Sequence, residues 1–179
     1  MAKSQVEIYL AKGALIGTLD GRVPGHDELT SPFDVVDARW YPTDGGPAER
    51  RARQRLMPDD AYLVVTSEPD VRVHSTWHVL TLDLGPYRVS GRLPTPPGFD
   101  PARALARPKG QFVGLRDAGI ELIGRPDAVV AERANVLVNR YLVDRAVAPL
   151  MLGFYFPGAI GELSALEATE AEAEAAPVA

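Results

Sequence analysis

Apolar and polar residues alternate along several short stretches of the chain, which is the pattern of half-buried β-strands. The alternating apolar residues are Val6, Ile8 and Leu10 near the start and Leu80, Leu82 and Leu84 further along. Gly13 and the pair Gly85-Pro86 predict turns that lead into the next strands. The further strands predicted from this pattern span 14–19, 33–41, 61–66, 87–93, 111–123 and 134–139. The sequence therefore predicts an all-β protein.

Several features recur in the same order at a separation of about 73 positions, which indicates an internal repeat. Gly17 and Leu19 correspond to Gly91 and Leu93 at an offset of 74, and the stretch 61–71 corresponds to 134–144 at an offset of 73. After a short insertion, Val36-Asp37-Ala38 corresponds to Leu115, Asp117 and Ala118. A unit of this size buries only about 60% of its unfolded surface, so two units packed together are more stable than one.

The repeat divides the chain into three parts. We predict a first β unit over residues 1–73, a second over 74–161 and an acidic Ala/Glu tail over 162–179 that favours a helix. Residues 42–59 interrupt the first unit, and we predict that they form a surface loop with a helical turn. Residues 149–161 are apolar and rich in Gly and Pro.

The net charge of −5 is not spread evenly over the chain. Five acids and no bases lie in residues 162–179, so the rest of the chain is balanced and has no long-range attraction for nucleic acid or anionic lipid. The absence of cysteine excludes disulfides, thiolate zinc sites and cysteine nucleophiles. No signal peptide or stretch of about 18 apolar residues is found, which predicts a cytoplasmic protein with no membrane partner.

The order of strands and short motifs resembles the Sm-like and SH3-like small β-barrels. In Sm-like proteins the second strand carries a glycine and the third an acidic residue followed by Ala, roles that Gly17 and Gly91, and Asp37 and Asp117, could fill. Asn139-Arg140 lies roughly where Sm-like proteins place an RNA-contacting turn. The chain is also similar to bacterial proteins of unassigned function that carry one such barrel. The resemblance implies two diverged barrel-like antiparallel units packed together, and it implies no activity.

No catalytic or cofactor motif is present. The chain lacks the Gly-x-Ser-x-Gly elbow and both phosphate-binding glycine motifs, so we predict no catalytic residue and no cofactor. His74 and His78 are spaced for one face of a strand with Asp70 nearby, but a surface location explains them more simply than a metal site does. We therefore expect no metal.

Two segments carry residue types that suit a partner. The candidate partner-binding residues are the apolar Met151, Phe154, Tyr155 and Phe156, which form either a core strand or an interface. The candidate anion or nucleic-acid contacts are Arg50, Arg51, Arg53, Arg55, Asn139 and Arg140. The same arginines could instead be a solvated loop or could bind an acidic tail, from this chain or from a neighbour.

These observations favour a non-enzymatic protein-interaction or assembly module that binds a protein partner or itself. An RNA- or DNA-associated regulator that uses the basic loop is the alternative, with nucleic acid not favoured because the body is neutral. A small-molecule-binding barrel is the second alternative.

Overall fold

The structure is a computed structural model, and it describes residues 3–20, 29–65, 76–98, 110–125, 130–152 and 154–164. Within these residues it contains strands and one short 3-10 turn, η1 (Pro58–Asp60), so the predicted all-β class is confirmed. The first half of the molecule comprises β1 (Lys3–Leu10), β2 (Gly13–Asp20), β3 (Phe33–Pro42), β4 (Glu49–Leu56) and β5 (Ala61–Val65). The second half comprises β6 (Thr76–Leu84), β7 (Tyr87–Thr95), β8 (Phe112–Leu122), β9 (Ala131–Asn139) and β10 (Arg145–Ala148). A short strand, β11 (Ile160–Leu163), follows.

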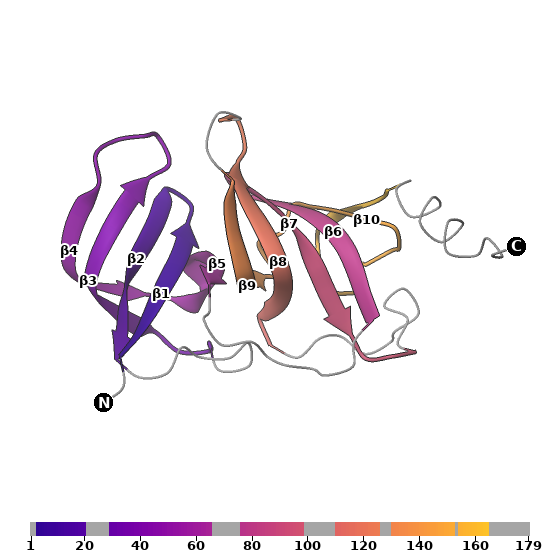
Figure 1. Cartoon of the computed structure of the whole chain (residues 1–179), viewed down its shortest axis with the longest axis horizontal. Helices are drawn as coiled ribbons and strands as arrows, with labels where there is room; N and C mark the ends of the chain where they lie inside the picture. Colours follow the sequence, from indigo (N-terminus) through magenta and orange to yellow (C-terminus); the bar gives the residue numbers. More distant parts are fainter. Residues whose placement is uncertain are drawn as a thin grey trace, which may run out of the picture.

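All the strands belong to one open sheet with the order β11-β10-β6-β7-β8-β9-β5-β1-β2-β3-β4. Each half has the same internal order, in which the first strand lies between the second and the fifth. The halves are joined by antiparallel pairing of β5 with β9, and Figure 1 shows them side by side along the long axis of the molecule. The structure therefore joins the two halves through backbone hydrogen bonds as well as side-chain packing.

Each half contains a β-bulge at the same place in its sheet. The register between the second and third strands shifts between Ile16 and Thr18 in the first half and between Ser90 and Arg92 in the second. Opposite these shifts, Asp37 and Asp117 have positive φ angles of 51° and 47°. Aspartate tolerates this left-handed conformation better than most residues, and a bulge bends its strand. Both third strands therefore bend where the sequence has the matching Asp-Ala pair.

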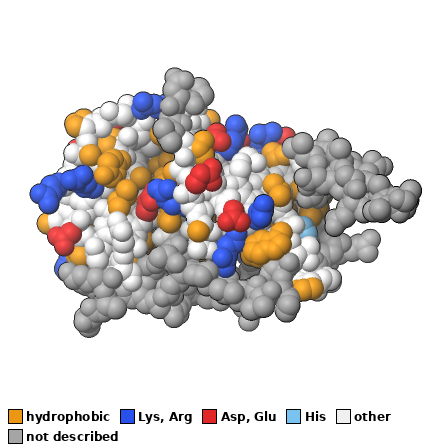
Figure 2. Space-filling model, in the orientation of Figure 1, with side chains coloured by type: hydrophobic (Ala, Val, Ile, Leu, Met, Phe, Trp, Pro, Cys, Tyr) orange, Lys and Arg blue, Asp and Glu red, His pale blue; other side chains and the backbone are white. Residues whose placement is uncertain are grey.

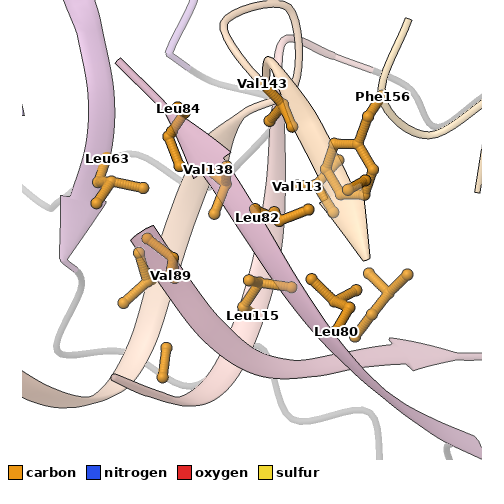
Figure 3. Packing of buried hydrophobic residues seen from close by; sticks show 14 of the residues in the cluster. Leu63, Leu80, Leu82, Leu84, Val89, Val113, Leu115, Val138, Val143 and Phe156 are labelled. Atoms are coloured by element: carbon orange, nitrogen blue, oxygen red, sulfur yellow. The ribbon is translucent and has the colours of Figure 1, made fainter. Parts of the chain in front are cut away.

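The hydrophobic core consists of two clusters, one in each half. The first includes Val6, Leu15, Val35 and Val64, and the second includes Leu80, Leu82 and Leu84 with many residues of β7 to β9. The joining strands contribute to both clusters, because alternate side chains of a strand point to opposite faces. Figure 3 shows Leu63 of β5 and Val138 of β9 beside the β6 leucines of the second cluster.

The remaining residues of β5 and β9 point the other way. The neighbouring Val64 and Leu137 belong to the first cluster. Both faces are thus covered where these strands pair, which explains the continuous apolar runs over 63–65 and 136–138.

The prediction of a surface loop with a helical turn over residues 42–59 is wrong. Residues 49–56 form the strand β4, and the only turn of helix type in this range is η1. The sequence ERRARQRL contains no apolar alternation because β4 is an edge strand, exposed along most of its length. An edge strand gains its stability from pairing on one side, so it does not need two buried faces.

The predicted correspondence between 61–71 and 134–144 is also wrong, because it matches β5 with β9, which is not the equivalent strand of the second half. Strand pairing matches β9 with β4, because Ala38 pairs with Arg51 where Ala118 pairs with Arg133. β5 is matched instead by β10, since both strands pair with the first strand of their half. The error arose because β4 was predicted to be a loop, so β5 was taken as the fourth strand of the first unit instead of the fifth.

The end of the chain differs in part from the prediction. Glu162 and Leu163, expected in the acidic tail, belong to β11, which pairs in parallel with β10. Residues 165–179, where the helix-prone tail was predicted, lie outside the described residues.

Candidate interaction surfaces

The outward face of β6 and β7 is a ladder of four cross-strand pairs. At one end Asp83 accepts two hydrogen bonds from the Arg88 guanidinium, at 2.7 and 3.0 Å. The next pair, Thr81 and Ser90, is joined by a hydroxyl hydrogen bond of 2.9 Å. The two remaining pairs are Val79 with Arg92 and Trp77 with Pro94. The face thus changes from charged to apolar along its length.

The apolar end of this ladder is open to solvent. Trp77 is 45% exposed and Val79 is 56% exposed, while the Leu80 side chain on the opposite face is buried. Figure 2 shows apolar side chains gathered beside basic and acidic ones in the region of β6 and β7. We call Trp77, Val79, Arg92 and Pro94 the Trp77 surface.

The first half has no counterpart to the Trp77 surface. By strand pairing, Trp77 and Pro94 match Lys3 and Asp20, and Val79 and Arg92 match Gln5 and Thr18. Four polar residues in one half are therefore replaced by three apolar residues and an arginine in the other. Packing of the shared fold cannot require these apolar side chains, because the matched positions do without them.

The Trp77 surface was not predicted from the sequence, although the residue pattern of β6 contains a signal for it. Leu80, Leu82 and Leu84 define the buried face of β6, and Trp77 and Val79 have the opposite parity. Apolar residues on both faces at one end of a strand are typical of a strand that is covered on both sides or binds a partner.

A row of alternating charges crosses the sheet at the other end of the ladder. Glu121, Arg88, Asp83, Arg145 and Glu162 come from β8, β7, β6, β10 and β11 in that order. Arg145 donates to both carboxylate oxygens of Glu162, at 2.7 and 2.6 Å, and lies 3.4 Å from Asp83. The two arginines hold the pKa of the Asp83 carboxyl below its usual value. The Arg145–Glu162 pair connects this row to β11, which also pairs with β10 through its backbone.

The basic cluster predicted from the sequence lies on β4, at one end of the sheet. Arg50, Arg53 and Arg55 are exposed, and the Arg51 guanidinium lies 4.5 Å from the centre of the Trp40 ring. These arginines are thus held along a strand, with the fixed spacing that a strand imposes.

Asn139 and Arg140 are not part of this basic surface, because each side chain is only 1% exposed. The Asn139 amide donates a 3.1 Å hydrogen bond to the Ala61 carbonyl, and Arg140 donates to the Phe154 carbonyl. Asn139 therefore links β9 to the start of β5 in the first half, whereas Arg140 holds the segment around Phe154 within the second half. A nucleic-acid contact would require them to leave these internal bonds.

The candidate aromatic segment is divided between core and surface. Tyr155 and Phe156 are buried in the second cluster, whereas Met151 and Phe154 are about half exposed. The segment forms turns rather than a strand. Only Met151 and Phe154 remain available to a partner.

An open groove of about 380 Å³ lies where the two halves meet. Its apolar lining includes Ile16 and Tyr41 from the first half and Leu122 from the second. At its polar part, Arg133 donates bidentate hydrogen bonds of 2.9 and 3.0 Å to Glu7. The Tyr9 hydroxyl also donates to Glu7, and burial raises the Tyr9 pKa well above its ordinary value. Glu7, Tyr9 and Arg133 therefore hydrogen-bond to one another, and the Glu7–Arg133 pair connects the two halves.

Among the described residues, no three His, Asp or Glu side chains are grouped as metal ligands. His78 lies 3.0 Å from the Thr95 hydroxyl, whereas His74 and Asp70 lie outside the described residues. The described part of the chain contains no helix that is long and apolar enough to cross a membrane.

No family model, no curated protein and no solved structure matches this chain.

Proposed function

We propose that this chain is a non-enzymatic protein-interaction module built from two diverged copies of one five-stranded, barrel-like unit of the Sm-like or SH3-like kind. Two observations support the duplication: the identical strand order within the halves and the bulge with a positive-φ aspartate in each. Offsets in the sequence and in strand pairing also agree, since Val6 pairs with Gly17 where Leu80 pairs with Gly91.

The Trp77 surface makes the partner contact. The observation that carries this proposal is the exposure of Trp77 and Val79 at positions that are Lys3 and Gln5 in the other half. Tryptophan and arginine are enriched among the residues that dominate binding energy at protein interfaces. Trp77 with Arg92 beside it, on a rigid strand pair, supplies such an anchor at little cost in conformational entropy.

The test is affinity purification from the native cells with quantitative mass spectrometry. The full chain is compared with the double variant Trp77→Ser/Val79→Thr and with the matched control Lys3→Ala/Gln5→Ala. We expect specific proteins to be retained by the wild type and the control and to fall about 30-fold with the double variant, because a central tryptophan contributes roughly 2 kcal/mol or more. A protein set that is the same for all three chains would overturn the proposal.

The same experiment separates the nucleic-acid alternative. If retention is abolished by nuclease and depends on Arg50, Arg53 and Arg55 rather than on Trp77, the chain is a nucleic-acid-associated regulator. Photo-crosslinking from position 79 then provides an independent check, since a crosslinker there captures a protein only if the Trp77 surface is covered.

Small-molecule binding is a second candidate function, favoured by the size of the junction groove. Ligand pockets have volumes of about 300–1,000 Å³ and are mostly apolar with a few polar groups. A fragment screen by NMR, repeated with Ile16→Arg, tests it: fragments that shift the Ile16 and Leu122 methyl signals only in the wild type would support this function. An absence of such fragments would exclude it.

A further inference from the structure

β4 offers an unpaired edge for another strand. It lies at the end of the sheet and pairs with β3 on one side, and no described strand pairs with its other side. The edge is eight residues long, and its outward backbone donors and acceptors pair with no strand among the described residues.

The matched strand of the second half shows that this position accepts a partner. The outer edge of β9 pairs antiparallel with β5, and Val136 and Leu137 of β9 lie opposite Val65 and Val64. The residues of β4 that match Val136 and Leu137 are Gln54 and Arg55. A strand that pairs with β4 therefore meets polar and positive side chains where β5 meets apolar ones.

Within the part of the chain that the structure describes, the charge of β4 is largely uncompensated. It holds four arginines against one glutamate, Glu49, which lies 3.3 Å from Arg51. Arg55 is 3.9 Å from Asp34, a distance at which an exposed pair contributes little. Arg50 and Arg53 have no ion pair within the described residues. The edge thus favours an acidic strand and disfavours a basic or apolar one.

The chain itself contains a segment of that chemistry. Residues 165–179 hold four glutamates and no Lys or Arg, and 170–174 reads Glu-Ala-Glu-Ala-Glu. In an extended strand Glu170, Glu172 and Glu174 lie on one face, because side chains alternate. Arg51, Arg53 and Arg55 have the same spacing of two on β4. The two series match residue for residue.

We propose that the acidic C-terminal segment of one molecule adds to the β4 edge of a second molecule as an antiparallel strand. Antiparallel addition, as β5 adds to β9, places Glu174, Glu172 and Glu170 opposite Arg51, Arg53 and Arg55. Opposite charges in cross-strand pairs stabilise a sheet. The small alanines between the glutamates lie on the other face, next to Ala52 and Gln54.

The geometry favours a second copy over the same chain. β4 and β11 are the two ends of the strand order, and Figure 1 shows β4 and β10 at opposite ends of the molecule. The six residue steps from Ser164 to Glu170 span at most about 22 Å. Ten strand spacings of about 4.8 Å separate β11 from β4 along the sheet. A contact between unlike surfaces joins molecules head to tail.

The test is sedimentation velocity of the full chain over a range of concentrations, with charge-reversal variants. We expect concentration-dependent association that weakens at high salt. Arg53→Glu/Arg55→Glu alone, or Glu170→Arg/Glu172→Arg alone, should weaken association about tenfold or more. The four changes combined in one chain should restore it, because the charges are then exchanged. All these positions are on β4 or beyond Ser164, and circular dichroism checks that each variant is folded.

Three results would overturn the proposal. The first is a wild-type chain that stays monomeric at every concentration, and the second is association that survives either of the single-sided reversals. A combined variant that stays as weak as the single-sided ones would also refute the pairing. The inference does not rest on the Trp77 surface, so Trp77→Ser/Val79→Thr should leave self-association unchanged.

Discussion

β4 and β9 occupy the same position in their halves, yet one is an edge and the other is the centre of the molecule. β9 carries Val136 and Leu137 where β4 carries Gln54 and Arg55. The apolar pair allows β5 to pack against β9 with both faces buried. The polar pair leaves β4 unable to repeat this junction with an apolar strand. Matched positions thus carry apolar residues in the strand that joins the two halves and polar ones in the strand that ends the sheet.

The opposite end of each half shows the same contrast. Tyr9, Ala14 and Leu63 of the first half pack against the cluster of the second half. The residues that match them by strand pairing are Asp83, Arg88 and Arg145, the centre of the charge row. Where the first half has an apolar contact surface for its neighbour, the second half has ion pairs and the additional strand β11.

Both ends of the molecule are therefore charged, and both interior surfaces are apolar. Arrays of stacked units need terminal units with polar outer surfaces, because each interior surface would otherwise be exposed. Polar outer surfaces at both ends of the sheet therefore disfavour addition of a further unit through the same apolar junction. The arginines of β4 also disfavour pairing of this edge with apolar strands, while they leave it open to an acidic one.

The largest effect is expected when matched residues of β4 and β9 are exchanged. Leu137→Arg gives β9 the residue of β4, and we expect it to lower the free energy of unfolding by about 4 kcal/mol or more, because the leucine is buried and the arginine would have no partner there. Urea denaturation monitored by circular dichroism measures the change.

The reciprocal change is the control for this exchange. Arg55→Leu gives β4 the residue of β9, and it should alter the free energy of unfolding by less than about 0.5 kcal/mol because Arg55 is exposed. It should, however, promote aggregation, since it makes the edge more apolar. Equal losses from the two variants would contradict the distinction between edge and centre.

A second prediction compares the glycines at the two bulges. A Cβ on Gly17 would lie 2.6 Å from the Val35 side chain and 2.9 Å from the Val36 carbonyl, whereas on Gly91 its nearest neighbours are at 3.1 Å. We expect Gly17→Ala to cost about 2–3 kcal/mol and Gly91→Ala about 1 kcal/mol or less. Thermal denaturation of the two variants measures the difference, and the reverse order would show that the first bulge relaxes more easily than its packing indicates.

A third prediction concerns the charge row. Arg88 and Arg145 lower the pKa of Asp83 in the folded protein, so its stabilisation is present above the ordinary value of about 4 and is lost as pH falls through the lower folded value. Asp83→Asn should therefore cost on the order of 1 kcal/mol at pH 7 and progressively less as the pH is lowered below 4.

Urea denaturation at pH values from 7 to 3 measures this dependence. Asp117→Asn is the matched control, because the Asp117–Arg92 pair is exposed on both sides and 3.6 Å long. A constant difference between wild type and Asp83→Asn across this pH range would contradict a stabilisation that depends on the ionised Asp83 carboxylate.

The predictable part of the fold is the part in which burial imposes a pattern. Strands with one buried face, such as β1 and β6, alternate visibly, and the glycine and aspartate of the bulges recur at matching positions. β4 was missed because an exposed edge imposes no apolar pattern, and β10 and β11 because four residues are too short to show one. Predicting the Trp77 surface would have required knowing which of the two alternating sets of β6 side chains is buried. The internal roles of Asn139 and Arg140 depend on chain segments that are distant in the sequence.

The smallest expected effect tests whether the two bulges are equivalent. Asp37 and Asp117 both have left-handed backbone conformations, which cost a residue with an ordinary side chain roughly 1 kcal/mol and cost glycine nothing. Asp37→Ala and Asp117→Ala should each lower the free energy of unfolding by up to about 1 kcal/mol, whereas the corresponding glycine variants should equal or slightly exceed the wild type. Urea denaturation of the four variants measures the changes. If alanine and glycine behave alike at one site only, the backbone of that bulge rearranges on substitution and the halves differ there; similar losses at both sites show that each bulge imposes the same constraint on its third strand.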